Sequence, residues 1–156
     1  PPINEILEIG KGRVIKEGKK VALINFGTRL EECKKASDTL LKKEIECTIV
    51  DARFAKPLDE KLIMETASNH EVLITIEEGS IGGFGSHVMQ FLSDRGVFDR
   101  GLKFRSMTLP DTFIDQDTPE KMYEIASLDN SSIASKVEET LNSNIILAKN
   151  KNKISN

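Results

Sequence analysis

The sequence predicts an α/β fold: a mostly parallel, open, twisted sheet of about five strands, with an antiparallel edge strand and helices on both faces. Apolar, β-branched segments recur at residues 21–26, 47–52 and 72–76, each is followed by a helix-like segment, and the connections are short. Nearly continuous apolar strands are typical of parallel sheets that are covered on both faces. The alternation and the strand composition together predict the fold class.

The start of the predicted domain contains two β-like segments, residues 13–17 and 21–26, joined by residues 18–20. This pattern predicts a hairpin or a tight turn, and the first strand of the hairpin would supply the antiparallel edge. Thr28 and Glu31 then have the spacing of a capping box, in which the two side chains satisfy free N–H groups at a helix start. A helix is therefore expected directly after the second strand.

Further start and stop signals lie along the rest of the chain. Asp59 is expected to cap a second helix, because a carboxylate at this position accepts hydrogen bonds from the first helical turn. Residues 103–109 predict the last strand. Thr118 followed by Pro119 predicts the start of another helix, since proline fits the first helical turn.

A length of 156 residues fits one domain. We expect a leader at residues 1–11, an α/β domain at residues 12–142, and a Lys/Asn-rich tail without fixed structure at residues 143–156. The chain begins at Pro1 rather than Met, which indicates a fragment or a processed chain. A missing targeting peptide therefore excludes no compartment.

Composition argues against nucleic acid or a membrane as the main partner. The chain has 22 Lys and Arg against 25 Asp and Glu, a formal net charge of −3, and the two signs are interspersed. No apolar run approaches the roughly 20 residues that a membrane-spanning helix needs.

The two cysteines and two histidines predict neither a metal site nor a nucleophile. Cys33 and Cys47 fall at apolar positions without CxxC spacing, which favours buried free thiols in a reducing compartment. His70 and His87 have no further Cys or His at metal-ligand spacing. We expect His70 to cap the carboxyl end of a helix, and His87 to be structural or to face an interface.

The Gly-rich segment at residues 79–85 is the most unusual stretch, because it links the carboxyl end of a strand to a helix, where ligands of open α/β sheets bind. In the best dinucleotide-binding register, which starts at Gly83, Val88 stands where a third glycine is needed. Tight backbone packing is the favoured interpretation, and nucleotide binding is the alternative. The candidate glycines are Gly79, Gly82, Gly83 and Gly85.

Charged residues follow several of the predicted strands. Glu77 and Glu78 are adjacent, so their side chains should point to opposite faces, and either one anchors the glycine segment through backbone N–H groups or both are exposed. Asp51, Arg53 and Asp111 also lie just after strands. Without a nucleophile, a metal set or a phosphate loop, these groups indicate a polar interface rather than a complete active site.

Four motifs occur in order along the chain, and together they carry a family resemblance. They are Ile24-Asn25-Phe26-Gly27-Thr28, Asp51-Ala52-Arg53-Phe54-Ala55-Lys56-Pro57-Leu58-Asp59, Glu77-Glu78-Gly79-Ser80-Ile81-Gly82-Gly83-Phe84-Gly85-Ser86-His87-Val88, and Leu109-Pro110-Asp111. With them the sequence resembles the carboxy-terminal domain of the 1-deoxy-D-xylulose-5-phosphate synthase family. The resemblance extends over residues 12–141. The sequence of residues 80–87 is most similar to the plant plastid enzymes, and the bacterial enzymes are close.

The resemblance implies a transketolase-type enzyme that depends on thiamine diphosphate. Such an enzyme condenses pyruvate with glyceraldehyde 3-phosphate, releases CO2, and serves the methylerythritol phosphate route to isoprenoids. In that family the cofactor, its Mg²⁺ and the catalytic His and Glu belong to preceding domains, whose motifs this sequence does not contain. The chain alone is therefore expected to lack catalytic, cofactor-binding and metal-binding residues, and its compartment is expected to be the plastid stroma or the bacterial cytoplasm.

The resemblance also implies partners. The glycine segment and its helix would pack towards a preceding pyrimidine-binding-type domain or the second subunit of a homodimer, with Glu77, Glu78, Gly82, Gly83 and His87 stabilising the assembly. Two alternatives stay open. One is the carboxy-terminal domain of another transketolase-type enzyme or of a 2-oxo acid dehydrogenase β-subunit, and the other is a free-standing nucleotide-binding α/β module.

Overall fold

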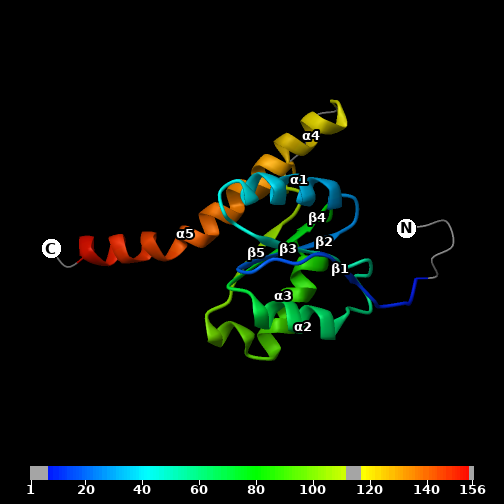
Figure 1. The fold of residues 1–156 in the computed structure, drawn as a ribbon, viewed down its shortest axis with the longest axis horizontal. Helices are drawn as coiled ribbons and strands as arrows, with labels where there is room; N and C mark the ends of the chain where they lie inside the picture. Colours follow the sequence, from blue (N-terminus) through cyan, green and yellow to red (C-terminus); the bar gives the residue numbers. More distant parts are fainter. Residues whose placement is uncertain (1–6, 112–116, 155–156) are drawn as a thin grey trace.

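A five-stranded sheet lies between two layers of helices in a computed structural model that describes residues 7–111 and 117–154 (Figure 1). The strand order is β1-β3-β2-β4-β5, with β1 antiparallel to β3 and the other neighbours parallel. This confirms the predicted fold class. The strands are β1 (Arg13–Lys16), β2 (Val21–Phe26), β3 (Cys47–Asp51), β4 (Val72–Glu77) and β5 (Lys103–Met107).

Each face of the sheet has its own helical layer (Figure 1). One face is covered by α1 (Leu30–Leu41), α4 (Pro119–Ile125) and α5 (Asn130–Ile154). The other face is covered by α2 (Glu60–Asn69), α3 (Phe84–Asp94) and the short 3₁₀ helix η1 (Val97–Arg100).

The apolar runs of the central strands explain the two layers. Successive residues of a strand point to opposite faces, so a strand covered on both sides must be apolar at every position. Leu23 and Ile74 belong to the core beneath α1 and α5, whereas their neighbours Ile24 and Leu73 belong to the core beneath α2 and α3. All four side chains are fully buried.

The predicted hairpin is wrong, although the antiparallel edge strand is confirmed. β1 pairs with β3, and β2 lies on the far side of β3. The connecting chain passes closely over the start of β3: the Gly18 N–H donates to Thr48 Oγ1 at 2.8 Å, and a Cβ at Gly18 would lie 2.3 Å from the carbonyl carbon of Cys47. The glycine therefore permits a crossing rather than a turn between paired strands.

The helix starts differ in how they are capped. The predicted capping box is wrong: α1 has Arg29 at its N-cap without a side-chain cap bond, and the Thr28 hydroxyl donates to Glu78 instead. The Asp59 cap of α2 is confirmed, because its carboxylate accepts from the Leu62 N–H at 3.1 Å.

The last helix extends further than the sequence predicts. α5 continues to Ile154, through the Lys/Asn-rich segment for which no fixed structure is expected, and Figure 1 shows this end projecting from the body of the domain. Helical hydrogen bonds are local, so a helix can continue beyond its packed residues. None of the helices in residues 7–111 and 117–154 combines the length and apolar character of a membrane span.

β5 forms the sheet edge opposite β1, and it ends at Met107, two residues earlier than the sequence predicts. The guanidinium of Arg105 donates to the carbonyl of Phe104, its neighbour in the same strand, at 2.7 Å. The edge strand thus satisfies one of its own backbone acceptors with a charged side chain.

Candidate functional site at the carboxyl edge of the sheet

The order of the parallel strands places a switch point between β2 and β4. The chain leaves β2 towards β3 on one side and then returns to β4 on the other side. In open α/β sheets, ligands bind where the connections diverge in this way, at the carboxyl ends of the strands. Residues 27–29 and the glycine loop, defined here as residues 79–83, lie at this point.

Glu77, the last residue of β4, holds the start of α3. The residue is 2% exposed, and its carboxylate accepts hydrogen bonds from the backbone N–H groups of Phe84, at 3.0 Å, and Gly85. These first-turn amides have no partner inside their helix, and the N-cap residue Gly83 has no side chain to supply one. Glu77 therefore acts as the missing cap, and we call this contact the Glu77 clamp.

Two glycines are required by the space that the Glu77 carboxylate fills, and a third is required by two neighbouring hydroxyl groups. A Cβ would lie 2.4 Å from Glu77 Oε1 at Gly79 and 2.2 Å from the same oxygen at Gly83. At Gly85 it would meet Ser106 Oγ at 2.5 Å and Thr75 Oγ1 at 2.6 Å. The fourth glycine, Gly82, has a φ of 99°, in the left-handed region that favours glycine. The glycine segment thus packs around an internal carboxylate, as the favoured interpretation expects.

Glu78 points the other way and binds two side chains. Its carboxylate accepts from the Thr28 hydroxyl and pairs with Arg29 Nε at 2.8 Å. The Arg29 guanidinium also lies over the Tyr123 ring, 3.4 Å from its centre. We call these four residues the Glu78 node. The node joins the loop after β2, the end of β4 and helix α4 at the switch point.

The charges of the node favour an ionised Glu78. Partial burial acts to raise the pKa of Glu78, but the hydrogen bond from Thr28, the nearby Tyr123 hydroxyl and the charge of Arg29 outweigh it and leave the pKa below its usual value. The nearby Glu78 carboxylate and burial raise the pKa of Tyr123.

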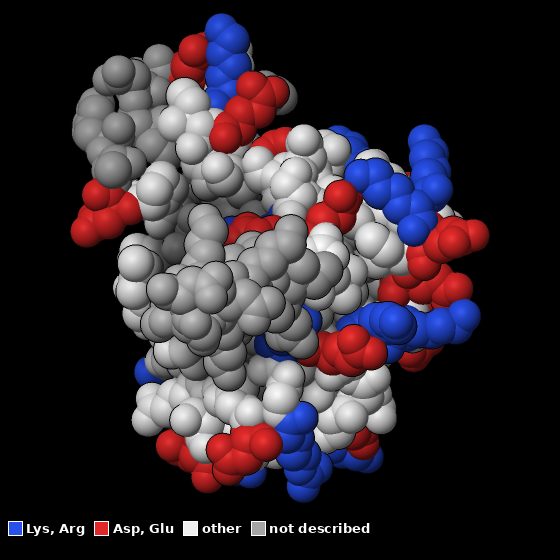
Figure 2. All heavy atoms as spheres, turned by 90° about the vertical axis from the view of Figure 1, so that its left-hand side faces the viewer, with Lys and Arg blue, Asp and Glu red and all other residues white. Residues whose placement is uncertain are grey.

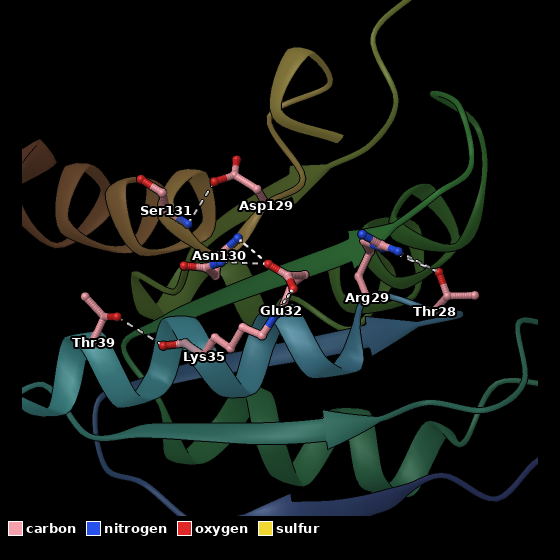
Figure 3. A network of polar contacts seen from close by, with 8 residues as sticks. All are labelled: Thr28, Arg29, Glu32, Lys35, Thr39, Asp129, Asn130 and Ser131. Atoms are coloured by element: carbon pink, nitrogen blue, oxygen red, sulfur yellow. Dashed lines mark hydrogen bonds and ion pairs between the residues drawn. The ribbon is translucent and has the colours of Figure 1, made fainter. Parts of the chain in front are cut away.

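A second polar network fixes α5 against α1, as Figure 3 shows. Glu32 accepts from the Asn130 backbone N–H at 2.9 Å and from its side-chain amide at 2.8 Å, and it also pairs with Lys35 at 2.7 Å. Asp129 accepts from the Ser131 N–H at 3.0 Å. These contacts cap the start of α5 and hold it against α1, so the network has a structural role.

Asp51 and Arg53 lie apart from Glu77 and Glu78, because β2 separates their strands. Asp51 pairs with Arg13 at 3.1 Å and with Arg53 at 3.8 Å. Arg53 has a φ of 59°, which is uncommon for a residue with a side chain. The predicted polar edge is therefore divided into two clusters rather than gathered in one.

The remaining predicted residues lie outside both clusters. His87 is half-buried on α3, in a shallow cleft that Glu60 and Arg95 also line. Asp111 is exposed at the end of a described range. His70 follows α2 as its C-cap, with Nδ1 at 2.7 Å from the Thr66 carbonyl oxygen, so its expected capping role is confirmed.

The described residues form no cluster that could hold a metal ion, and charges of both signs are mixed on one face of the molecule (Figure 2). No group of three or more His, Cys, Asp or Glu side chains within residues 7–111 and 117–154 is placed to hold a metal. On the face shown in Figure 2, the described Lys and Arg side chains alternate with Asp and Glu. Cys33 and Cys47 are buried free thiols.

Comparison with known proteins decides the family. The model of the transketolase C-terminal domain family matches residues 10–133. This chain belongs to that family. A solved structure described as a split gene transketolase, an inactive β4 tetramer, is similar to this chain, with a TM-score of 0.78 and 29% sequence identity. The match covers 86% of this chain and 43% of that one.

A transketolase from Campylobacter jejuni subsp. jejuni NCTC 11168 shares the fold of this transketolase C-terminal domain, with a TM-score of 0.61 and 14% identity. The match covers 89% of this chain and 20% of the Campylobacter chain. The domain thus spans less than half the length of either structure.

Sequence reasoning identified both glutamates and the glycines but missed Thr28, Arg29 and Tyr123. Thr28 was assigned to a helix cap, and its partner Glu78 is 50 residues away in the chain. Tyr123 carries no local motif, although it is the single tyrosine of the sequence. Only the crossing of the chain at the switch point brings these residues together.

Proposed function

We propose that this chain is the accessory carboxy-terminal domain of a 1-deoxy-D-xylulose-5-phosphate synthase. The complete enzyme would condense pyruvate with glyceraldehyde 3-phosphate, with loss of CO2, in the methylerythritol phosphate route to isoprenoids. Its compartment would be the plastid stroma or, in a bacterial enzyme, the cytoplasm. Membership of the transketolase C-terminal domain family supports the general class, and the four ordered motifs support the synthase.

The Glu77 clamp carries the accessory role. A helix start in a glycine-rich loop binds phosphate when its backbone N–H groups are free. Here the Phe84 and Gly85 N–H groups are bound by an internal carboxylate, and a phosphate would meet the negative charge of Glu77. The glycine loop is therefore suited to packing, which disfavours the free-standing nucleotide-binding module.

Thiamine diphosphate does not fit the described residues of this chain. Its Mg²⁺ would need a set of oxygen ligands, and the described residues present no cluster of that kind. Its diphosphate would need free donors at the switch point, where the available amides and Arg29 are engaged by Glu77 and Glu78. We therefore assign no reaction step to this domain and place the cofactor in other domains of the complete enzyme.

The surface around the glycine loop is suited to an assembly partner. Residues 79–93 contain no Lys, Arg, Asp or Glu, in a chain with 30% charged residues. Ile81 is 81% exposed and Met89 is 47% exposed on this segment. Interface cores are depleted in charge and enriched in residues such as Met. We assign this surface to the preceding pyrimidine-binding-type domain or to the second subunit of a homodimer.

Substrate assays of the complete enzyme test the synthase assignment. We expect CO2 release from pyruvate that depends on glyceraldehyde 3-phosphate. Transfer of a two-carbon ketol unit from a ketose phosphate to an aldose phosphate, without decarboxylation of pyruvate, would instead identify another transketolase-type enzyme. The latter result would overturn the synthase assignment and leave the family membership intact.

Calorimetric titration of the 156-residue chain tests the accessory role separately. We expect no binding heat with thiamine diphosphate plus Mg²⁺, with NAD or with ATP. Saturable binding of a nucleotide that is lost in Gly83→Val would favour the nucleotide-binding module. Tight binding of thiamine diphosphate would contradict the placement of the cofactor in other domains.

A further inference from the structure

We propose that helix α4 is a strap at the switch point, with the stack of Tyr123 on Arg29 as its latch and Ser127 as its hinge. The strap opens and closes while the sheet and the other helices keep their places. This inference goes beyond the proposed function and does not depend on which enzyme the domain serves.

The burial of α4 in the domain is concentrated at its carboxyl end. Ala126 and Leu128, which follow the helix, are 5% exposed and fully buried, respectively. Towards the amino end, Pro119 and Lys121 are exposed, and Lys121 pairs with Asp117 in the same segment at 3.5 Å. Segments with few buried apolar contacts open locally more readily than a packed core does. The amino part of α4 is therefore the part that opens.

A hollow lies between α4 and the helices beside it. This cavity, of about 370 Å³, is lined by Pro119 and Tyr123 of α4, by Arg29 and Glu32 at the start of α1, and by Asn130 at the start of α5. Figure 3 shows the Glu32 side chain bound to Asn130, so these two residues remain with α1 and α5 when α4 moves. Because packed side chains do not fill this space, α4 can lift from α1 with little loss of buried apolar surface.

The latch is the contact between Arg29 and Tyr123. The Arg29 guanidinium lies over the Tyr123 ring, 3.4 Å from its centre, while its Nε pairs with Glu78 at 2.8 Å. The carboxylate holds the guanidinium at its edge and leaves a flat face for the ring. The Arg29 and Glu78 side chains are 14% and 27% exposed, and a cation–π contact is stronger when it is shielded from water. Closure of α4 therefore depends on Arg29.

Ser127 is suited to act as the hinge because of its backbone conformation. Its φ is 57°, in the left-handed region that is uncommon for a residue with a side chain. Its N–H donates to the Glu124 carbonyl at 3.0 Å, and the Leu128 N–H donates to the Tyr123 carbonyl at 2.9 Å, which ends α4 in a reversed turn. Hinges are often residues at the ends of elements that absorb changes in φ and ψ. Ser127 loses its backbone strain when this turn unwinds, so the hinge favours opening and the latch opposes it.

Opening of α4 would change what the carboxyl edge of the sheet presents. The closed strap covers one face of the Arg29 guanidinium with an aromatic ring. With α4 lifted, this face becomes accessible beside Glu78, at the edge where ligands of open α/β sheets bind. The state of the strap therefore determines whether this positive charge is accessible at the switch point.

Amide hydrogen exchange of α4 in the 156-residue chain measures the opening. The Met122 N–H donates to the Thr118 carbonyl and the Ala126 N–H to the Met122 carbonyl, both at 3.0 Å, and a detached helix of 7 residues is too short to keep such bonds. We expect Arg29→Lys, which keeps the charge but loses the flat stacking face, to speed exchange of both amides by about threefold to tenfold. Lys34→Ala, which removes an exposed ion pair on α1, is the matched control and should leave both amides unchanged.

Two further variants separate the latch from the hinge. Tyr123→Leu keeps an apolar side chain against the core and loses the ring face, so it should have a similar effect, and the double variant with Arg29→Lys should exchange no faster than Tyr123→Leu alone. Ser127→Gly acts in the opposite direction. Glycine adopts the left-handed conformation without strain, so this variant favours the closed strap and should slow exchange of the same amides by about threefold.

Exchange of the Met122 and Ala126 amides at the same rate in Arg29→Lys and Lys34→Ala would overturn the latch. Effects of Arg29→Lys and Tyr123→Leu that multiply would show that the two residues act independently, which also contradicts it. Faster exchange in Ser127→Gly would overturn the hinge. Equal acceleration of the amides of β2 would overturn the strap as a separate unit, because exchange would then follow global unfolding.

Discussion

The carboxylate of Glu77 fills the place that a side chain at Gly83 would need, since a Cβ there would lie 2.2 Å from Glu77 Oε1. The two residues are therefore a matched pair: the glycine makes room for the acid, and the acid caps the helix that the glycine begins. This relationship explains the glycine-rich sequence without a bound nucleotide.

Gly83→Ala should destabilise the domain by about 1–3 kcal/mol, because the added methyl group displaces a buried carboxylate from its amide donors. Urea unfolding followed by circular dichroism measures the change. Ser80→Ala, at an exposed position of the same loop, is the matched control and should be close to neutral. Equal stability of the two variants would contradict the clamp.

Asp59→Ala should cost about 1–2 kcal/mol of unfolding free energy through loss of the α2 N-cap. The same carboxylate also accepts from the Gly12 N–H at 3.2 Å, so the segment just before β1 loses a contact as well. Asp59→Asn keeps an acceptor oxygen and should retain most of the stability. Similar losses in both variants would show that charge, rather than capping, matters at this position.

Glu78 should make the free energy of unfolding depend on pH in the acidic range. Its pKa is lower in the folded chain than the unfolded value, so the carboxylate stabilises the fold above the unfolded pKa, and this stabilisation is lost as the pH falls through the folded pKa. Wild type should therefore exceed Glu78→Gln in unfolding free energy at about pH 7, and the gap should narrow towards about pH 3. A gap that stays constant across this range would exclude the effect.

The two thiols should be unreactive in the folded chain. Burial raises the pKa of Cys33 to about 12 and that of Cys47 to about 11, and the thiolate is the reactive form. A colorimetric disulfide reagent at neutral pH should modify neither cysteine until urea unfolds the domain. Rapid labelling without unfolding would show that one of the helices over this core opens locally.

Ile81→Lys should weaken assembly of the complete enzyme by about tenfold if the uncharged surface is the interface. Analytical ultracentrifugation over a concentration series measures the association. Ile125→Lys is the matched control, because Ile125 is also an exposed isoleucine, 60% exposed, but lies on α4. Equal association of both variants would place the interface elsewhere.

The sequence predicts most of the architecture because its signals there are local. Apolar periodicity identifies the five strands and their helices, and alternation along β4 correctly sends Glu77 and Glu78 to opposite sides. Strand pairing is not local: β1 and β2 are neighbours in the chain, yet β3 lies between them.

The candidate site was predictable only in part for the same reason. The anchoring role of one glutamate was one of two expected alternatives, and the clamp confirms it. A capping pattern compares residues three apart, so it favours Glu31 as the partner of Thr28. The partner in the fold is Glu78, which is 50 residues away in the chain. The Thr28 hydroxyl donates to a carboxylate at the switch point and does not cap a helix start.

The contact between Arg105 and Phe104 affects how the domain behaves at high protein concentration. Exposed edge strands are the sites at which separate molecules join their sheets into aggregates. On β5 a guanidinium already covers one backbone acceptor, and a strand from another molecule would have to displace this charge before it could pair there. Arg105 therefore opposes polymerisation of the domain through this edge.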